Sequence, residues 1–432
     1  MAPELVGILG VIVMLLLISM RMWIGVAMGV VGIIGIAILR NWDLAIENAA
    51  AVSFANVNSY TLTVIPMFAL MGMIIAESRI GTDLFNACNA WLGRVRGGLA
   101  STTVVASGFL GAICGSHTVS TVILSKMALP EMKRYNYHDG FAAATVAVGA
   151  PFSIVIPPSL ALILYAILTE QPVGKMFIAG IIPGILMVLA ALALIRIMCT
   201  IKPELGPKGE KFSLREKLKA TLGIIPVIIL FLLVLGGIYL NVFTTTESGA
   251  IGAVGAIIIS LCYKTLNGKK FLIALKETAM TVGMVFSLLL GTYIFIRFIT
   301  LSQLPNALTN FMVGLNAPVP VIMLMLALVY ILLDMVMPEI PMIILSVPII
   351  YPAMMVLGFD PIWLGIYIAL WMALAAITPP IGMVVFIISG MSGVPVTKIF
   401  KSVMPFIAAD AFVIILICVF PVLVTWLPSL MG

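Results

Sequence analysis

The sequence predicts an all-α polytopic membrane protein. Of its 432 residues, 62% are hydrophobic and only 9% are charged, and the mean hydropathy is +1.24. A soluble domain carries about 25% charged residues, far more than this chain. Apolar runs that approach the roughly 20 residues needed to cross a bilayer recur along the chain. The first run begins at Leu5 and has no basic segment before it, so we interpret it as a membrane segment rather than a signal peptide.

Several function classes lack their sequence signatures. The five cysteines have no paired spacing and the two histidines are far apart, which argues against a disulfide framework and a zinc site. No Walker loop, zinc-hydrolase motif or nucleophile elbow occurs, which argues against an ATP-driven pump and the common hydrolases. The net charge of +6 comes from basic residues in short loops, where they indicate topology rather than nucleic-acid binding.

Prolines reveal a duplication. They recur at a constant offset of 222 residues, and one of the matched features is a double proline. The matches are Pro130 with Pro352, Pro157–Pro158 with Pro379–Pro380, and Pro183 with Pro405. One coincidence would mean little, but several at one offset indicate an internal repeat. We therefore expect a first repeat at residues 1–201, a linker at residues 202–219 and a second repeat at residues 220–432.

The charges predict that the two repeats are inverted. The linker carries six basic against three acidic residues, so we expect a solvated cytoplasmic segment. Residues 98–129 are apolar, interrupted near Gly115–Ser116 and flanked by basic residues, which indicates a re-entrant hairpin that enters from the cytoplasm. The equivalent hairpin, residues 320–351, lies in a region without Lys or Arg, so we expect it to enter from outside. The same count places both termini outside, and such inverted repeats are typical of secondary transporters.

Two amphipathic stretches, Arg79–Arg96 and Ser302–Leu315, precede the two hairpins. Each mixes Leu or Phe with Asn, Asp or Gln. They are expected to lie along the membrane surface as struts, or to be ordinary connecting helices.

The double prolines predict a broken helix in each repeat, at residues 139–167 and 361–390. Proline lacks an N–H and leaves a carbonyl without its helical partner, and in hydrocarbon that carbonyl needs another one. Discontinuous helices commonly bind Na⁺ in this way, although prolines can also simply kink a helix for packing. We expect two sodium sites between tips and breaks: Cys114, Gly115 and Ser116 facing Ser153, Ile156 and Pro158, and Met337, Pro338 and Glu339 facing Ala375, Thr378 and Pro380.

Helix N-termini at the same breaks favour an anionic substrate. The expected substrate contacts are Gly115, Ser116, His117, Thr118, Ser159 and Glu339. A lone histidine is more often a satisfied polar residue than a ligand, and Glu339 is alternatively a cation ligand or a proton carrier. Asp334 is expected near a water-filled cavity, whereas Asp410 is interpreted as structural.

Together these segments resemble the large membrane subunit of tripartite ATP-independent periplasmic (TRAP) transporters, over nearly the whole chain. The matching segments are Arg94–Ala100, Ile113–Ser116, Ile156–Ser159, Ala179–Gly184, Phe243–Glu247 and Thr378–Pro380. The resemblance implies a bacterial inner-membrane protein with an elevator-type, ion-transporter-superfamily fold. It also implies sodium coupling and two partners, a small four-helix membrane subunit and a soluble periplasmic substrate-binding protein.

The resemblance further implies a first sodium site at Cys114, Ser116, Ser153, Ile156 and Pro158. Cys114 stands where the family usually has serine, and Ser153 where it usually has glycine. The second tip, Met337–Glu339, reads Met-Pro-Glu in place of the usual Met-Asp-Pro.

The predicted function is sodium-coupled import of a small organic anion, a carboxylate or sulfonate, delivered by the binding protein. The alternative is a stand-alone sodium/carboxylate symporter of related fold. A membrane enzyme is disfavoured because the sequence contains no catalytic constellation.

Overall fold

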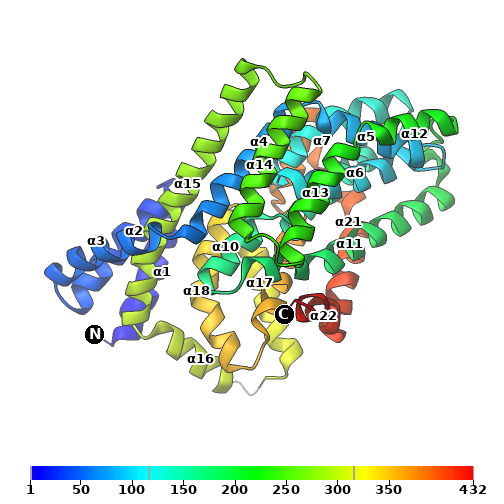
Figure 1. Cartoon of the computed structure of the whole chain (residues 1–432). Helices are drawn as coiled ribbons and strands as arrows, with labels where there is room; N and C mark the ends of the chain where they lie inside the picture. Colours follow the sequence, from blue (N-terminus) through cyan, green and yellow to red (C-terminus); the bar gives the residue numbers. More distant parts are fainter. Residues whose placement is uncertain (1, 115–116, 315–316, 432) are drawn as a thin grey trace.

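The computed structural model describes residues 2–114, 117–314 and 317–431, and the regular secondary structure in these ranges is helical apart from one isolated β-bridge between Arg96 and Lys208 (Figure 1). The first half contains α1 Pro3–Ser19, α2 Ile24–Leu39, α3 Trp42–Val57, α4 Val64–Glu77, α5 Ile80–Leu92, α6 Gly98–Cys114, α7 His117–Arg134, α8 Asp139–Gly149, α9 Phe152–Val155, α10 Leu160–Leu168 and α11 Val173–Ile201. The second half contains α12 Leu214–Leu222, α13 Ile225–Tyr239, α14 Thr245–Cys262, α15 Gly268–Leu301, α16 Leu304–Gly314, α17 Val319–Asp334, α18 Glu339–Val356, α19 Pro361–Ala375, α20 Met383–Ser392, α21 Val396–Val419 and α22 Val422–Ser429.

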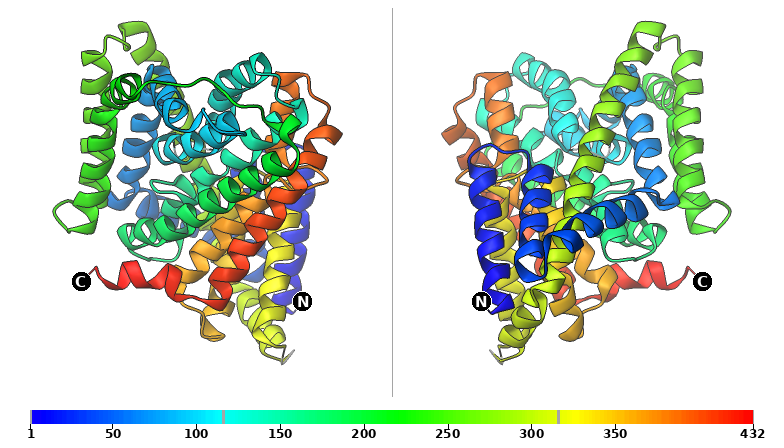
Figure 2. Two further views of the ribbon diagram at one scale, coloured as in Figure 1. Left: turned by 90° about the vertical axis from the view of Figure 1, so that its right-hand side faces the viewer. Right: turned by 90° about the vertical axis from the view of Figure 1, so that its left-hand side faces the viewer.

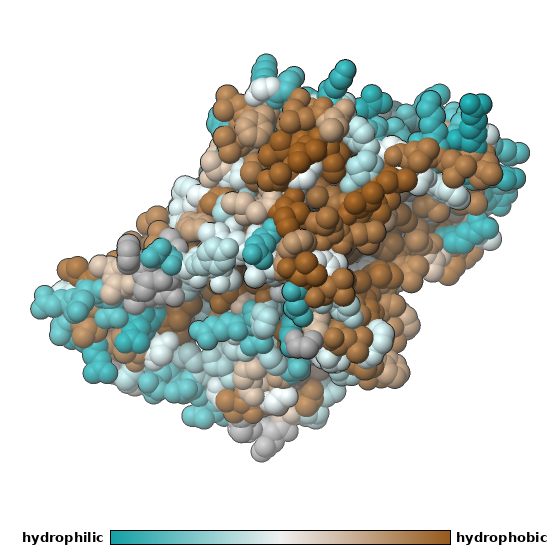
Figure 3. All heavy atoms as spheres, in the orientation of Figure 1, coloured by the Kyte–Doolittle hydropathy of each residue, from teal (hydrophilic) through white to brown (hydrophobic). Residues whose placement is uncertain are grey.

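Seven helical segments in the described ranges are long and apolar enough to cross a membrane. They are Tyr60–Glu77, Asp139–Leu168, Val173–Ile201, Thr245–Cys262, Gly268–Leu301, Glu339–Val356 and Val396–Val419. The pair α12 and α13 would add an eighth span, bent by 50°. Apolar surface covers the region of α13 and α14 between more hydrophilic ends (Figure 3), as expected for a face in contact with lipid.

The two broken helices form the centre of the molecule. Most residues of α8 and α19 are buried, and so are the short α9 and nearly all of α10. These segments are shielded from lipid by the other helices, and α8 is rich in Ala and Gly, which lets neighbouring backbones approach closely. Both double prolines, Pro157–Pro158 and Pro379–Pro380, lie where these central helices break, and both contain a cis peptide bond.

The hairpins lie at opposite ends of the molecule. Helices α6 and α7 lie with α5 and α12 toward the upper end, whereas α16, α17 and α18 lie toward the lower end (Figures 1 and 2). Both termini also lie at the lower end (Figure 2). Each hairpin contacts the broken helix in the other half of the chain: α7 packs against α20, and α18 packs against α10.

Part of the linker is hydrogen-bonded to the rest of the protein, whereas its charges predict a solvated segment. Gly206 is buried, and its carbonyl accepts a hydrogen bond of 2.8 Å from the N–H of Gly97, just before α6. The carbonyl of Leu205 accepts a 3.3 Å bond from the N–H of His138, just before α8. The Tyr137 hydroxyl donates to the Pro207 carbonyl at 3.1 Å. We call this bonded segment, residues 205–207, the strap.

Candidate functional site

The tips of the two hairpins meet through one pair of side chains. The returning arm α7 begins at His117 and the returning arm α18 begins at Glu339, and these residues are 222 positions apart. Nδ1 of His117 contacts Oε2 of Glu339. His117 is 3% exposed and Glu339 is 7% exposed. A carboxylate buried to this degree needs a partner, and the imidazole of the other hairpin supplies it.

A second carboxyl lies beside this pair. Asp334 ends α17 and is 7% exposed, and only four residues separate it from Glu339 at the start of α18. Deeper in the same hairpin, the Tyr330 and Ser346 hydroxyls share a 2.8 Å hydrogen bond. The centre of the two hairpins therefore holds one imidazole and two carboxyl groups in a mostly apolar surrounding, the kind of intramembrane cluster that marks a functional site.

The first proline break leaves oxygen atoms available. Pro157 has no N–H for the carbonyl of Ser153, and Pro158 has none for the carbonyl of Ile154. The Ser159 hydroxyl replaces the missing donor at Ile154, at 2.7 Å, and so is committed to the backbone. The carbonyl of Ser153 receives no such bond from its own helix, and its hydroxyl donates to the Ala150 carbonyl at 2.9 Å. Such an oxygen suits a hard cation, so this break fits the predicted sodium site.

The first hairpin comes into backbone contact with this break. A Cβ atom added to Gly111 of α6 would lie 2.8 Å from both the Cα and the N of Ser153. Only glycine fits at this crossing. Gly111 lies one turn before Cys114, so the predicted ligands at the tip are carried on the arm that touches Ser153. Gly115 and Ser116 lie outside the described residues, and only the backbone of Cys114 is described.

The second break differs from the first. The Ala375 carbonyl accepts from the N–H of Thr378 at 2.9 Å, and the Ala376 carbonyl accepts from the N–H of Val384 at 3.3 Å. The Thr378 hydroxyl donates to the Leu374 carbonyl at 2.7 Å. The two carbonyls that Pro379 and Pro380 leave without a helical donor, those of Ala375 and Ala376, are thus already bonded, although each keeps a second lone pair. Pro158 is buried whereas Pro380 is exposed, so the two predicted sodium sites have different surroundings.

A cavity beside α7 leads to the tip of the first hairpin. Its volume is about 490 Å³. It is lined from Lys126 to Thr118, about 12 Å along the helix axis, and by Glu77 of α4 and Glu277 of α15. Thr118 is exposed, whereas the neighbouring His117 is buried. The cavity therefore connects the upper end of the molecule with the residue next to the buried pair.

The structure thus places the predicted contacts in distinct surroundings. Thr118 faces the cavity, His117 and Glu339 bond to each other, and Ser159 is enclosed. Met337 is 1% exposed at the second tip. Asp410 is buried on α21, and its Oδ1 atom has no hydrogen-bond partner among the described residues. Sequence reasoning missed the cavity residues on α4 and α15, because only packing brings these separate helices together.

Comparison with known proteins decides the family. A family model for the DctM component of tripartite ATP-independent periplasmic transporters matches residues 11–423. The chain belongs to this family. It is 30% identical over 386 residues to the C4-dicarboxylate TRAP transporter large permease protein DctM of Pseudomonas aeruginosa, which covers 89% of this chain and 88% of that protein.

Two further similarities bear on the same assignment. The chain is 27% identical over 399 residues to the sialic acid TRAP transporter large permease protein SiaM of Vibrio cholerae, across 90% of this chain and 92% of that protein. The crystal structure of the YdaH transporter of Alcanivorax borkumensis covers 100% of both chains with a TM-score of 0.66 at 14% identity, which supports the fold alone. The predicted all-α membrane fold, the TRAP family and the prediction of a transporter rather than an enzyme are therefore confirmed.

Proposed function

We propose that this TRAP large subunit is the transport core of a sodium-coupled importer for a small organic anion, a carboxylate or sulfonate. The observation that carries the proposal is the meeting of both hairpin tips at His117 and Glu339, together with a broken helix in which Pro157 leaves the Ser153 carbonyl without its helical donor. Curated relatives named for C4-dicarboxylates and sialic acid support a carboxylate. The cavity that ends at Thr118 supports release of the substrate toward the upper end.

The proposed orientation places the upper end in the cytoplasm of a bacterial inner membrane and both termini in the periplasm. The basic linker lies at the upper end, and positively charged loops remain in the cytoplasm. In this orientation the hairpin α6–α7 enters from the cytoplasm and α17–α18 from the periplasm. The hairpins and broken helices would move together, in an elevator-type cycle.

The proposed partners are a small four-helix membrane subunit and a soluble periplasmic substrate-binding protein, in keeping with a tripartite periplasmic family. Sodium, when bound, supplies positive charge for the substrate's anionic group. Ser153, Ile156 and Pro158 with the first tip would hold one ion, and Ala375, Thr378 and Pro380 with the second tip another. The exposed Thr118 and the N-terminus of α7 would orient the substrate.

The test is uptake of radiolabelled anion into proteoliposomes that contain this chain and its small partner. We expect uptake to require both a sodium gradient and the binding protein. Sodium-driven uptake without the binding protein would instead establish the stand-alone symporter. Uptake that ignores sodium would overturn the ion sites.

Two variants test the residues. Ser116→Ala and Thr378→Ala are expected to raise the sodium concentration for half-maximal uptake, because each removes one oxygen near a proposed ion. Thr309→Ala on α16 is the matched control, since its hydroxyl also bonds to a carbonyl four residues earlier, at 2.8 Å, but lies in the connecting helix. Unchanged sodium activation in both test variants would refute the assignment.

A further inference from the structure

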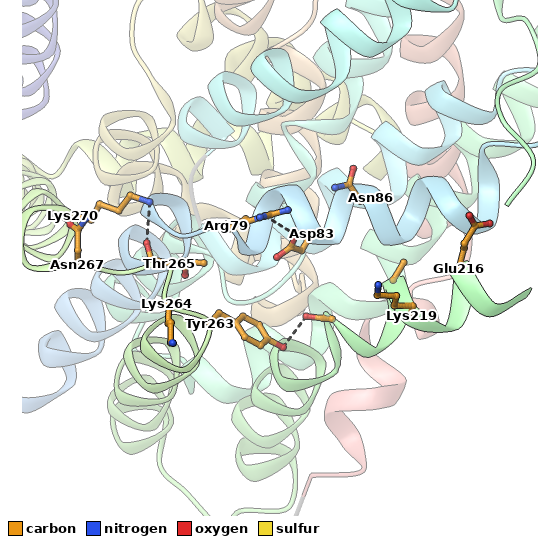
Figure 4. A pocket seen from close by; sticks show the side chains of 12 residues that line it. Arg79, Asp83, Asn86, Glu216, Lys219, Tyr263, Lys264, Thr265, Asn267 and Lys270 are labelled. Atoms are coloured by element: carbon orange, nitrogen blue, oxygen red, sulfur yellow. Dashed lines mark hydrogen bonds and ion pairs between the residues drawn. The ribbon is translucent and has the colours of Figure 1, made fainter. Parts of the chain in front are cut away.

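A charged pocket lies at the upper end, away from the hairpin tips (Figure 4). Its volume is about 810 Å³, and it is formed by α5, α12, the end of α14 and the start of α15. Four basic and two acidic side chains line it: Arg79, Lys219, Lys264 and Lys270, with Asp83 and Glu216. The excess of basic groups makes it a favourable place for an anion.

The basic groups differ in how they are engaged. Arg79 Nε lies 3.2 Å from the Asp83 carboxylate, and Lys270 Nζ donates to the Thr265 carbonyl at 3.0 Å. Lys219 and Lys264 are exposed and form no ion pair within the described residues. These two lysines are therefore the groups best placed to bind a further negative charge.

The pocket lies at the depth of the bilayer surface. Helix α12 exposes a stripe of leucines, Leu214, Leu218 and Leu222, which are 68%, 52% and 63% exposed. Its other residues include three lysines or arginines and a glutamate, so it has the pattern of a helix that lies in the membrane interface. Trp91 of α5 donates to the Thr221 hydroxyl at 2.9 Å, and interfacial tryptophans mark the same depth.

An apolar groove lies next to this pocket, lined by the sequence neighbours of several pocket residues. A first cavity of about 160 Å³ includes Ile80 and Leu84, which alternate along α5 with the pocket residues Arg79 and Asp83. A second cavity of about 310 Å³ shares Phe109 and Phe231 with the first. Together they form one groove.

The groove has the length of a lipid tail. It follows α13 from Ile224 to Leu235, about 17 Å along the helix axis. One leaflet of the hydrocarbon core is about 15 Å thick. Its deep end is lined by Ile156 and Pro157, at the first break.

We propose that the pocket and groove bind one anionic phospholipid from the leaflet at this end. The headgroup occupies the pocket that Lys219 and Lys264 line, and an acyl chain follows α13 toward Pro157. Basic pockets between membrane helices are known to bind anionic headgroups. A soluble anion would leave the groove unused, and a neutral lipid would leave the lysines without a partner charge.

The experiment measures binding of dioleoyl phosphatidylglycerol to the purified full chain by native mass spectrometry, with dioleoyl phosphatidylcholine as the neutral comparison. We expect phosphatidylglycerol to bind at least tenfold more tightly. Lys219→Gln with Lys264→Gln should abolish this preference. Lys398→Gln with Lys401→Gln, the same charge change on exposed residues of α21, should retain it.

A second variant tests the groove without changing charge. Ile228→Trp replaces a half-buried residue on α13 with a side chain that fills the groove, and should weaken binding of both lipids. Equal binding of the two lipids by the wild type would overturn the proposal. So would equal loss in both lysine variants, full competition by glycerol phosphate alone, or exclusion of the lipid when the small membrane subunit is added.

Discussion

Exchanging the residues of the buried pair provides a stringent test of the hairpin contact. The double variant His117→Glu/Glu339→His places the same two side chains in reversed positions. Because these positions are equivalent in the two repeats and the side chains contact each other, the exchange should restore the bond that either single change breaks. We therefore expect the exchanged protein to be more stable than both single variants.

The magnitude follows from the burial of each partner. His117→Glu sets a third carboxyl beside Glu339 and Asp334, which are each 7% exposed. Loss of one partner from a buried charged pair costs about 3–5 kcal/mol. Glu339→His leaves two imidazoles, which can stay neutral, beside the single carboxyl of Asp334, so its cost is nearer the roughly 1–3 kcal/mol of an unsatisfied buried polar group. The exchange should recover about 2 kcal/mol or more relative to His117→Glu.

Stability is measured by thermal unfolding of the detergent-solubilised protein at fixed pH and sodium concentration. Tyr330→Phe serves as the comparison, since it removes a neutral 2.8 Å bond to Ser346 in the same hairpin at a cost of about 1 kcal/mol. If the exchanged protein is no more stable than His117→Glu alone, the two side chains do not stabilise each other and the pairing is wrong.

Two further predictions concern the first hairpin. Gly111→Ala should lower the free energy of unfolding by about 1–3 kcal/mol and weaken sodium activation of uptake, because its new Cβ would lie 2.8 Å from the Ser153 backbone. The control is Gly283→Ala, whose new Cβ would have nothing within 4 Å. In the same unfolding and uptake assays, this control should be neutral or slightly stabilising. In a cysteine-free background, Thr118→Cys should react with a membrane-impermeant thiol reagent added at the end where α12 lies, whereas Ser159→Cys, at 0% exposure, should stay unlabelled. Labelling of Thr118→Cys only from the opposite end would contradict the access route.

The sequence predicted the helices near the site well, because strong local signals mark them. The predicted tip at Gly115–Ser116 lies outside the described residues, whereas Met337–Glu339 falls where α17 gives way to α18. The double prolines interrupt the central helices, as their missing N–H groups require. The ion sites and the inverted orientation remain predictions.

The side-chain partners are much less accessible to sequence reasoning. The residue patterns predict His117 and Glu339 as separate contacts, although their offset of 222 equals that of the prolines. Equivalent residues in two repeats can meet where the repeats face each other, so this offset is the available signal. No sequence signal predicts the hydrogen bonds to the carbonyls of Ala375 and Ala376, because these bonds depend on how the chain turns around Pro380.

The strap has a mechanical consequence for gating. It is bonded to Gly97 at the start of the first hairpin and to Tyr137 and His138 at its end, and the Tyr137 hydroxyl also accepts from the N–H of Leu99 at 3.1 Å. Both chain ends of the hairpin are thereby hydrogen-bonded to the segment that follows α11. Swinging this hairpin outward as an independent lid would break these bonds together. Access at this end should therefore change by displacement of the hairpin along with α8 and the end of α11, as a single body.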